Sequence, residues 1–390
     1  MLALKLAYRN LAGAGLRTWL NVIVLSFSFV FIIWFKGFLE GWNREARRDM
    51  IQWEIGGGQF WHEAYDPYDP FTLQDAHGMI PPVFQNEIDQ GRLTPMLLAQ
   101  GTFYPQGRMH SVMLRGIDPD QSILDIPSRL FHEAGESIPV IIGTRMASNH
   151  SLDRGDNVTV RWRDVKGAFD AAEAVIVDIF KSNVPGVDAG QMWIPLNRLQ
   201  TMTGMEGEAT LLVIRQNTKI ESSHPEWMLK DHRFLLAEID QIIKTKSMGS
   251  SIFYIMLLSL ALLAIFDTQV LSIFRRQREI GTDMALGMTR GQVVRLFTVE
   301  GTMHAFLAAG LAALYGIPFL YFQAKRGFPM PEGVDDYGLA IAEKIYPVYS
   351  AGLVAGTTIL VLVAATVVSY LPATKIARMK PTESIKGKIQ

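Results

Sequence analysis

Four long apolar stretches divide the sequence. Their cores run over residues 18–35, 247–274, 301–323 and 345–374, and Asp267 is the only Asp, Glu, Lys or Arg within them. A helix needs about 20 apolar residues to cross the hydrocarbon core of a bilayer, so the pattern predicts four transmembrane helices. The alternative for the first stretch, a cleaved signal peptide, is disfavoured because the apolar run is too long and no small-residue cleavage site follows it.

The region between the first two apolar stretches has a different pattern. Short β-rich runs predict strands at residues 111–117, 157–162, 174–180 and 210–215, and short helices are expected after Gly143 and at residues 194–202. Residues 225–246 carry apolar positions at helical spacing, which predicts a long helix leading into the second apolar stretch. The predicted fold class is therefore a membrane protein with four transmembrane α-helices and a large mixed α/β domain between helices 1 and 2.

Composition agrees with a mixed architecture. The 390 residues are 49% hydrophobic and 19% charged, with a mean hydropathy of +0.15. This is too apolar for an ordinary soluble protein and too polar for a chain that lies entirely in a membrane. Cysteine is absent, which excludes disulfides, thiolate metal sites, Cys nucleophiles and a lipid-bearing N-terminal Cys.

Charge is distributed unevenly along the chain. Residues 40–246 hold 20 Lys and Arg against 29 Asp and Glu, whereas the remainder holds 17 against 9. Basic residues concentrate before the first span, between the second and third spans, and in the C-terminal tail. Because Lys and Arg favour cytoplasmic loops, these three segments are predicted in the cytoplasm, and the acidic domain is predicted outside.

The loop between the second and third spans has the signals of a folded element. In "FRRQREIGTDMALGMTRGQVVRLFTVEG", Ile280, Met284 and Leu286 form an apolar surface among charged residues. Gly287 suits the position after a helix C-terminus, and Thr289 with Gln292 forms a capping box for the next helix. A helix–Gly–helix elbow is predicted. An interfacial helix that only anchors the chain explains this segment equally well.

Other motifs give no catalytic or metal site. His132 and Glu133 lack the second His of a helical zinc motif, and the acidic loop at residues 62–69 is better explained as solvated surface. The 390 residues contain no Gly-Lys-Ser/Thr phosphate loop, so any ATP is expected to bind a partner subunit.

Two polar residues interrupt the apolar spans. At ~1.5 Å rise per residue, Asp267 and His304 are expected ~12 and ~13 Å from their cytoplasmic helix ends. Similar depth predicts that they can pair, within one chain or across a dimer. For Asp267 by itself, a polar contact within a subunit interface is favoured over a proton site.

The elbow resembles the coupling segment of the macrolide-exporter, lipoprotein-releasing and FtsX-like class of ABC permeases. That class has Arg-Glu-Ile-Gly, Ala-Leu-Gly and Glu-Gly at this spacing, here at residues 278–281, 285–287 and 300–301. The N-terminal Arg9-Asn10-Leu11 and the C-terminal Pro372-Ala373, Ala377-Arg378 and Pro381-x-Glu383 are also similar to this class. Residues 115–120 and 141–156 resemble its lipoprotein-releasing branch, and the similarity spans almost the whole chain.

The resemblance implies a permease without enzymatic activity of its own. Its expected partners are an ABC ATPase that supplies ATP and Mg²⁺, a second permease copy or homologous permease, membrane lipid, and a lipoprotein substrate with a periplasmic carrier; no nucleic acid, metal or directly bound cofactor is expected. The residues implied to contact the ATPase are Arg276, Arg278, Glu279, Ile280, Gly281, Ala285, Leu286 and Gly287, and Asp267 and His304 are the intramembrane polar pair.

The implied location is the bacterial inner membrane, with both termini cytoplasmic. The expected segments are a cytoplasmic amphipathic helix (1–16), the first span (17–39), a periplasmic α/β domain (40–246), the second span (247–274), the coupling helix and elbow (275–292), the third span (293–323), a short periplasmic loop (324–345), the fourth span (346–374) and a cytoplasmic tail (375–390). Extraction or export of lipoproteins or another amphipathic substrate is the expected activity. The alternatives are a mechanotransmitter that regulates a periplasmic cell-wall hydrolase and a tripartite efflux permease.

Overall fold

A computed structural model of the chain describes residues 15–133, 137–329 and 344–377. The predicted N-terminal amphipathic helix, most of the loop 324–345 and most of the C-terminal tail lie outside these residues. The described part forms two compact units. The first, the helix unit, comprises the residues up to Asn43, Ile243–Pro329 and those from Lys344 onward, and the second, the sheet unit, comprises Arg44–Ile242.

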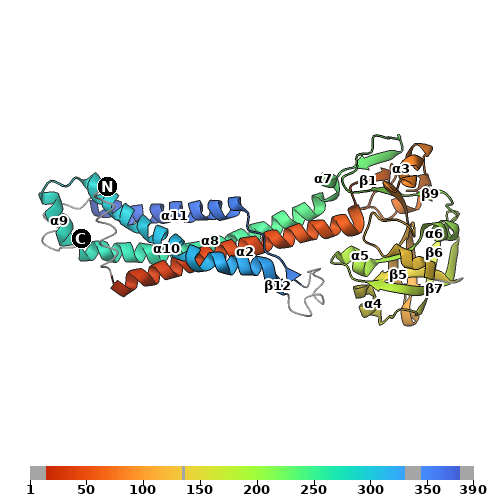
Figure 1. The fold of residues 1–390 in the computed structure, drawn as a ribbon, viewed down its shortest axis with the longest axis horizontal. Helices are drawn as coiled ribbons and strands as arrows, with labels where there is room; N and C mark the ends of the chain where they lie inside the picture. Colours follow the sequence, from red (N-terminus) through yellow and green to blue (C-terminus); the bar gives the residue numbers. More distant parts are fainter. Residues whose placement is uncertain (1–14, 134–136, 330–343, 378–390) are drawn as a thin grey trace. The chain divides into compact units, whose positions relative to one another are not determined.

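The helix unit is built from long helices (Figure 1). They are α2 (Gly15–Met50), α8 (Ala237–Arg275), α10 (Arg290–Arg326) and α11 (Ala351–Ala377), with the short α9 (Gln277–Ala285) between α8 and α10 and a pairing of β12 (Phe328–Pro329) with β13 (Lys344–Ile345). All four long helices have the length and apolar composition of membrane spans. The predicted fold class is confirmed: four apolar helices, with a large α/β domain inserted between the first and the second.

The helices extend beyond the apolar windows from which they were predicted. α2 continues to Met50 and α8 begins at Ala237, because helix-forming charged residues flank the apolar stretches and can continue the backbone ladder. α11 begins at Ala351, later than expected. The segment before it contains Pro347, which cannot donate a backbone hydrogen bond, and the N–H of Val348 donates to the carbonyl of Gly37 in α2 instead (2.9 Å).

Small side chains fill the interior of the helix unit. Ala261, Ala305, Ala308 and Ala365 are buried where α2, α8, α10 and α11 meet. Polar contacts also cross between helices: Asn21 bonds to Thr268, and the hydroxyls of Thr302 and Thr366 lie 3.1 Å apart. Close backbone approach and interhelical hydrogen bonds are the usual means of helix association in lipid.

The sheet unit contains a mixed sheet of nine strands in the order β11-β1-β10-β3-β4-β8-β5-β7-β6. Its strands are β1 (Gln59–His62), β3 (Leu93–Tyr104), β4 (His110–Ile117), β5 (Ile138–Gly143), β6 (Asn157–Arg163), β7 (Phe169–Phe180), β8 (Gln191–Pro195), β10 (Leu211–Ile214) and β11 (Trp227–Lys230), and β2 (Gly78–Met79) pairs with β9 (Glu208–Ala209). Its α-helices are α3 (Gln85–Asp89), α4 (Thr144–His150), α5 (Pro185–Gly190), α6 (Leu196–Thr203) and α7 (His232–Leu235). Single turns complete it: η1 (Ile51–Ile55), η2 (Thr72–Gln74), η3 (Pro82–Phe84), η4 (Pro105–Gly107) and η5 (Ser128–Glu133).

The long strand β3 closes part of this sheet into a ring. One edge of β3 pairs with β4, while its other edge pairs first with β10, over Leu93–Met96, and then with β6, over Gly101–Tyr104. The pairings therefore connect β3, β4, β8, β5, β7 and β6 in a closed circuit. Apolar side chains such as Phe103, Val140 and Met192 form one buried core. A second core lies on the outer face of the sheet and includes Trp193.

Most local predictions for this domain are confirmed. Strands β4, β6, β7 and β10 and helices α4 and α6 occur where the sequence placed them. The long helix predicted over residues 225–246 is confirmed from Ala237 onward, where α8 continues into the second span, but its predicted first part is wrong. Trp227–Lys230 form strand β11 because the Trp227 side chain is buried and the segment pairs with β1, after which Asp231 accepts the N–H of Phe234 (2.9 Å) and starts α7. Strand pairing and side-chain burial outweigh the helical periodicity there.

Candidate coupling site at the elbow

The elbow between α8 and α10 is a folded element with defined ends. α9 begins after Arg276, and its last turn closes through the N–H of Gly287, which donates to the carbonyl of Met284 (3.2 Å). Gly287 has φ of +107°, a conformation that favours glycine. Thr289 then caps α10: its hydroxyl accepts the N–H of Gln292 (3.3 Å), and the Gln292 side chain accepts the N–H of Thr289 (2.8 Å). The predicted stop and start signals are confirmed.

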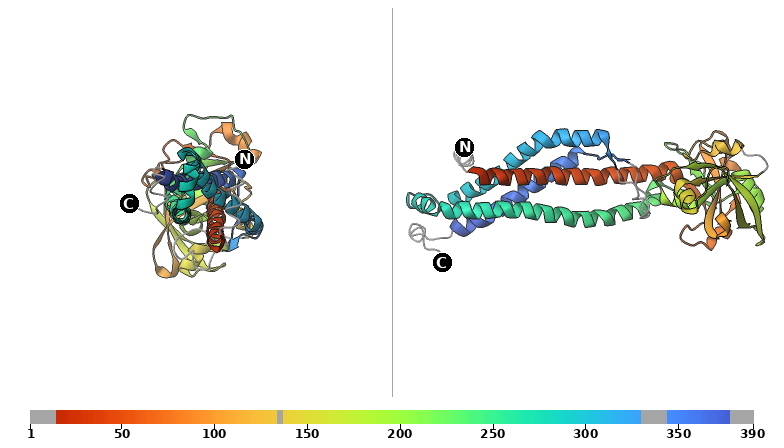
Figure 2. Two further views of the ribbon diagram at one scale, coloured as in Figure 1. Left: turned by 90° about the vertical axis from the view of Figure 1, so that its left-hand side faces the viewer. Right: turned by 90° about the horizontal axis from the view of Figure 1, so that it is seen from below.

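One side of α9 packs against the chain's own helices. Ile280 is buried with Ile273 of α8, Val293 and Phe297 of α10, and Ala373 of α11, and Met284 packs against this cluster. Gly281 is also buried. The apolar face that the sequence predicted is therefore occupied within the helix unit. At this end of the unit α2 begins and α11 ends (Figure 1 and Figure 2).

Arg276 ties the start of α9 to α10. Its guanidinium donates to the buried carboxylate of Glu300 (3.1 Å) and to Glu279 (3.1 Å), and lies 5.3 Å from the centre of the Phe297 ring. Bonds to two carboxylates and an aromatic face hold the guanidinium in one place. The Arg276 guanidinium thus places a fixed positive charge next to the buried carboxylate of Glu300 in α10.

Next to Glu300, Gly301 permits three helices to meet. A Cβ atom added at Gly301 would overlap Ser369 of α11 and lie 3.0 Å from the amide nitrogen of Gln269 in α8. Gln269 and Ser369 are both almost completely buried. Neither was predicted as a site residue; the available signal was a polar residue within an apolar span.

The predicted coupling residues fall into two groups. Arg276, Ile280 and Gly281 position the elbow through the contacts described above. The others, Arg278, Glu279, Ala285, Leu286 and Gly287, are exposed. The sequence pattern predicts Leu286 on the apolar surface with Ile280 and Met284, but its side chain is 82% exposed. The reason is that α9 ends at Ala285 and Leu286 lies in the turn that follows.

Asp267 and His304 do not pair within the chain, which excludes the first of the two predicted arrangements. Asp267 is exposed on α8, whereas His304 is buried on α10, and no hydrogen bond or ion pair joins them. The Nδ1 atom of His304 instead lies 2.9 Å from the carbonyl oxygen of Glu300, and its Nε2 atom has no partner among the described residues. Pairing across a dimer stays a prediction.

Comparison with known proteins places this elbow in a recognised domain. Residues 251–381 match the model of the FtsX-like permease C-terminal domain, which includes most of α8 and all of α9, α10 and α11. Residues 251–381 are thus similar to FtsX-like permeases. The match begins within the second span and contains the elbow, Glu300 and Gly301.

Curated proteins similar to this chain are named macrolide export ATP-binding/permease protein MacB. The protein from Chromobacterium violaceum is 24% identical over 247 residues, which cover 54% of this chain and 37% of that protein. The protein from Bordetella avium is 22% identical over 295 residues, which cover 64% and 42% of the two chains. The chain thus spans less than half the length of these relatives.

A solved structure also shows similarity. It is the extracellular domain of the noncanonic ABC-type transporter YknZ from Gram-positive bacteria, 14% identical, with a TM-score of 0.27 over 41% of this chain and 83% of that chain. A TM-score this low supports no structural argument.

Proposed function

We propose that this chain is the membrane subunit of an ABC transporter. ATP hydrolysis in a separate ATPase subunit would drive a conformational change in the α/β domain, and the elbow would receive the force. The observation that carries this proposal is the division of α9 into a packed side and an exposed side. An interfacial anchor needs a free apolar face for lipid. Here Ile280 is buried against Phe297 and its neighbours, so little apolar surface other than Leu286 is left for a bilayer.

The exposed residues give a partner surface of mixed character. Arg278 and Glu279 supply opposite charges, and Leu286 supplies an apolar contact at the tip of the elbow. Because the packed residues hold this surface against α8 and α10, a movement of the bound partner would displace these two helices. ATP and Mg²⁺ would bind to the ATPase, and a second permease copy or a homologue would complete a dimer.

The proposed location is the bacterial inner membrane, with both termini and the elbow in the cytoplasm and residues 40–246 in the periplasm. The absence of native cysteine makes this orientation directly testable. Gln216→Cys and Arg278→Cys place single thiols at exposed positions of the α/β domain and the elbow. In cells with a permeabilised outer membrane, an impermeant thiol reagent should label only Gln216→Cys; labelling of only Arg278→Cys would reverse the orientation.

For the substrate, we propose a lipoprotein or another amphipathic molecule taken from the periplasmic side. The names of the curated relatives favour a second candidate, export of a macrolide-like compound. Affinity purification from mild detergent, followed by mass spectrometry, distinguishes these possibilities. Recovery of an ABC ATPase is required by the proposal. A co-purifying lipoprotein or carrier supports release, an adaptor with an outer-membrane channel supports efflux, and a cell-wall hydrolase without a transport partner would replace transport by mechanotransmission.

A further inference from the structure

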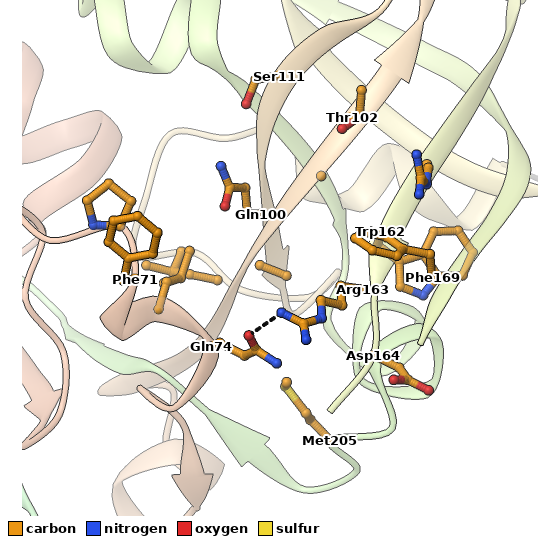
Figure 3. A pocket seen from close by; sticks show the side chains of 16 residues that line it. Phe71, Gln74, Gln100, Thr102, Ser111, Trp162, Arg163, Asp164, Phe169 and Met205 are labelled. Atoms are coloured by element: carbon orange, nitrogen blue, oxygen red, sulfur yellow. Dashed lines mark hydrogen bonds between the residues drawn. The ribbon is translucent and has the colours of Figure 1, made fainter. Parts of the chain in front are cut away.

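The outer face of the strand ring carries a cleft of about 340 Å³ in the sheet unit (Figure 3). Its floor contains the polar side chains of Gln100 and Thr102 from β3 and Ser111 from β4. Phe71 and Phe169 stand on opposite sides, and a hydrogen bond joins the side chains of Gln74 and Arg163 (2.7 Å). The volume lies within the range of about 300–1,000 Å³ that is typical of ligand pockets.

The cleft lies at an interruption in strand pairing. Along this edge of β3, pairing with β10 ends at Met96 and pairing with β6 begins at Gly101. The Thr210 hydroxyl accepts the N–H of Leu98 (3.1 Å) and so replaces part of the missing strand. Beyond it, Gln100 is exposed. An unpaired stretch of strand edge can bond to the backbone of an extended peptide.

The cleft also presents a cation without an acidic partner. Arg161 makes no hydrogen bond or ion pair with any other described residue, and its guanidinium lies 4.2 Å from the centre of the Phe169 ring. Stacking on an aromatic face fixes the guanidinium plane and leaves its N–H groups free to bind a carboxylate. The neighbouring Arg163 is already engaged by Gln74 (2.7 Å) and by the carbonyl of Gly167 (3.1 Å).

Two exposed aromatic rings complete the surface. Phe71 is 90% exposed and Phe169 is 64% exposed, and they stand on opposite sides of the polar floor. Exposed aromatic side chains on either side of a hydrogen-bonding floor are typical of peptide-recognition sites. Arg161 and Arg163 outnumber Asp164, the one acidic residue that lines the cleft, so the cleft is positive within a domain that is acidic as a whole.

We propose that this cleft binds a short, extended, acidic segment of a partner protein. A carboxylate of the segment would bind Arg161, its backbone would bond to the β3 edge near Gln100, and an apolar side chain would lie between Phe71 and Phe169. The short gap between β10 and β6 limits the bound segment to a few residues, so specificity would come from the carboxylate and its apolar neighbour. This goes beyond the proposed transport function and assigns a second contact surface, separate from the elbow.

Peptide selection tests this assignment with the full-length chain in detergent. The probe is a phage-displayed library of random twelve-residue peptides, and the expected result is enrichment of an Asp or Glu beside an apolar residue. A synthetic consensus peptide should bind at least about tenfold more weakly to Arg161→Glu and to Phe169→Ala. The matched control Arg129→Glu reverses the charge of an exposed arginine that does not line the cleft and should bind normally.

A charge reversal in the peptide separates recognition from misfolding. A peptide whose acidic residue is replaced by Lys should recover binding to Arg161→Glu, which a misfolded variant cannot show. The proposal would be overturned by a library without enrichment, or by enriched peptides that bind Arg161→Glu as tightly as the native chain. Displacement of the peptide by anionic phosphatidylglycerol vesicles, but not by zwitterionic ones, would assign the cleft to a lipid headgroup and also contradict it.

Discussion

The two units of the chain differ in where they place large side chains, although the helix unit also buries a few, such as Phe29 and Phe297. In the sheet unit the largest residues are the most buried, among them Trp193, Phe60 and Phe84. In the helix unit the completely buried positions of α10 and α11 include Ala305, Ala308 and Ala365, while large side chains such as Ile252 of α8 and Leu314 of α10 are exposed.

The difference follows from the solvent of each unit. In water, removal of large apolar surfaces drives folding, so bulky residues belong inside. In lipid the surroundings are as apolar as leucine, and helices associate through close packing of small residues and through polar contacts. The sheet unit should therefore be most sensitive to atoms that are removed, and the helix unit to atoms that are added.

The largest effect is expected from adding atoms at Gly301. A leucine there would collide with Ser369 and Gln269, so Gly301→Leu should abolish recovery of folded, monodisperse protein. Gly310 of the same helix has no atom within 4 Å of an added Cβ, and Gly310→Leu is the matched control. Size-exclusion chromatography in detergent measures both variants. Equal recovery would show that the close approach of α8, α10 and α11 does not limit packing.

The reverse change tests the sheet unit. Trp193→Ala removes a completely buried ring and should destabilise this unit by about 3–5 kcal/mol. Phe71→Ala removes an equally apolar but exposed ring and should change its stability by less than about 0.5 kcal/mol. Hydrogen exchange of strand β8 in the full-length protein reports the difference. A smaller loss for Trp193→Ala than for Phe71→Ala would contradict the comparison.

The charged contact at the base of the helix unit should have an intermediate effect. Glu300→Gln leaves the Arg276 guanidinium without its buried carboxylate and should cost about 1–3 kcal/mol. Glu279→Gln removes the exposed partner of the same guanidinium and should cost about 0.5 kcal/mol or less. Thermal unfolding in detergent compares the two. If Glu279→Gln proved the more costly, the anchoring role of Glu300 would be wrong.

The smallest effect concerns acidification of the sheet unit. Burial, and then the neighbouring His110, lower the pKa of His150 below its usual value near 6.5. Its neutral form is thus favoured by folding, and this contribution is complete above pH ~6.5 and is lost as the pH falls through the lowered pKa. His150→Gln should reduce the loss of thermal stability between pH 7.5 and 5.5. An unchanged pH profile would exclude His150 as a source of that loss.

Local chemistry predicted much of the helix unit. The lengths of the apolar stretches predict the four spans. Gly287, Thr289 and Gln292 predict the elbow, because helix caps depend on residues only a few positions apart. Which side of a helix faces inward depends on its neighbours, and this could not be predicted. Asp267 and His304 have similar depth, yet the buried positions of α8 recur every four residues from Ala261 to Ile273, so Asp267 points about 200° away from Ile265.

Long-range pairing limited prediction in the sheet unit. Trp227 was assigned to a helix because its neighbours have helical spacing, but its strand is determined by β1, which is distant in the sequence. The pairing gap in β3 likewise arises from the separate ends of β10 and β6. No local pattern at Gln100 or Arg161 signals the cleft.

The central claim is that the elbow transmits force from an ATPase, and ATP turnover of the reconstituted complex tests it most directly. Glu279→Arg keeps α9 amphipathic and should strengthen attachment to anionic lipid, while Gly287→Val places a β-branched residue at a φ of +107°. Gly291→Val is the matched control, since Gly291 lies in the first turn of α10 with open space around it. The account predicts that Glu279→Arg and Gly287→Val lose stimulated turnover and substrate movement while Gly291→Val retains both. Turnover and complex recovery at the native level in both elbow variants would contradict the account and identify the elbow as an anchor.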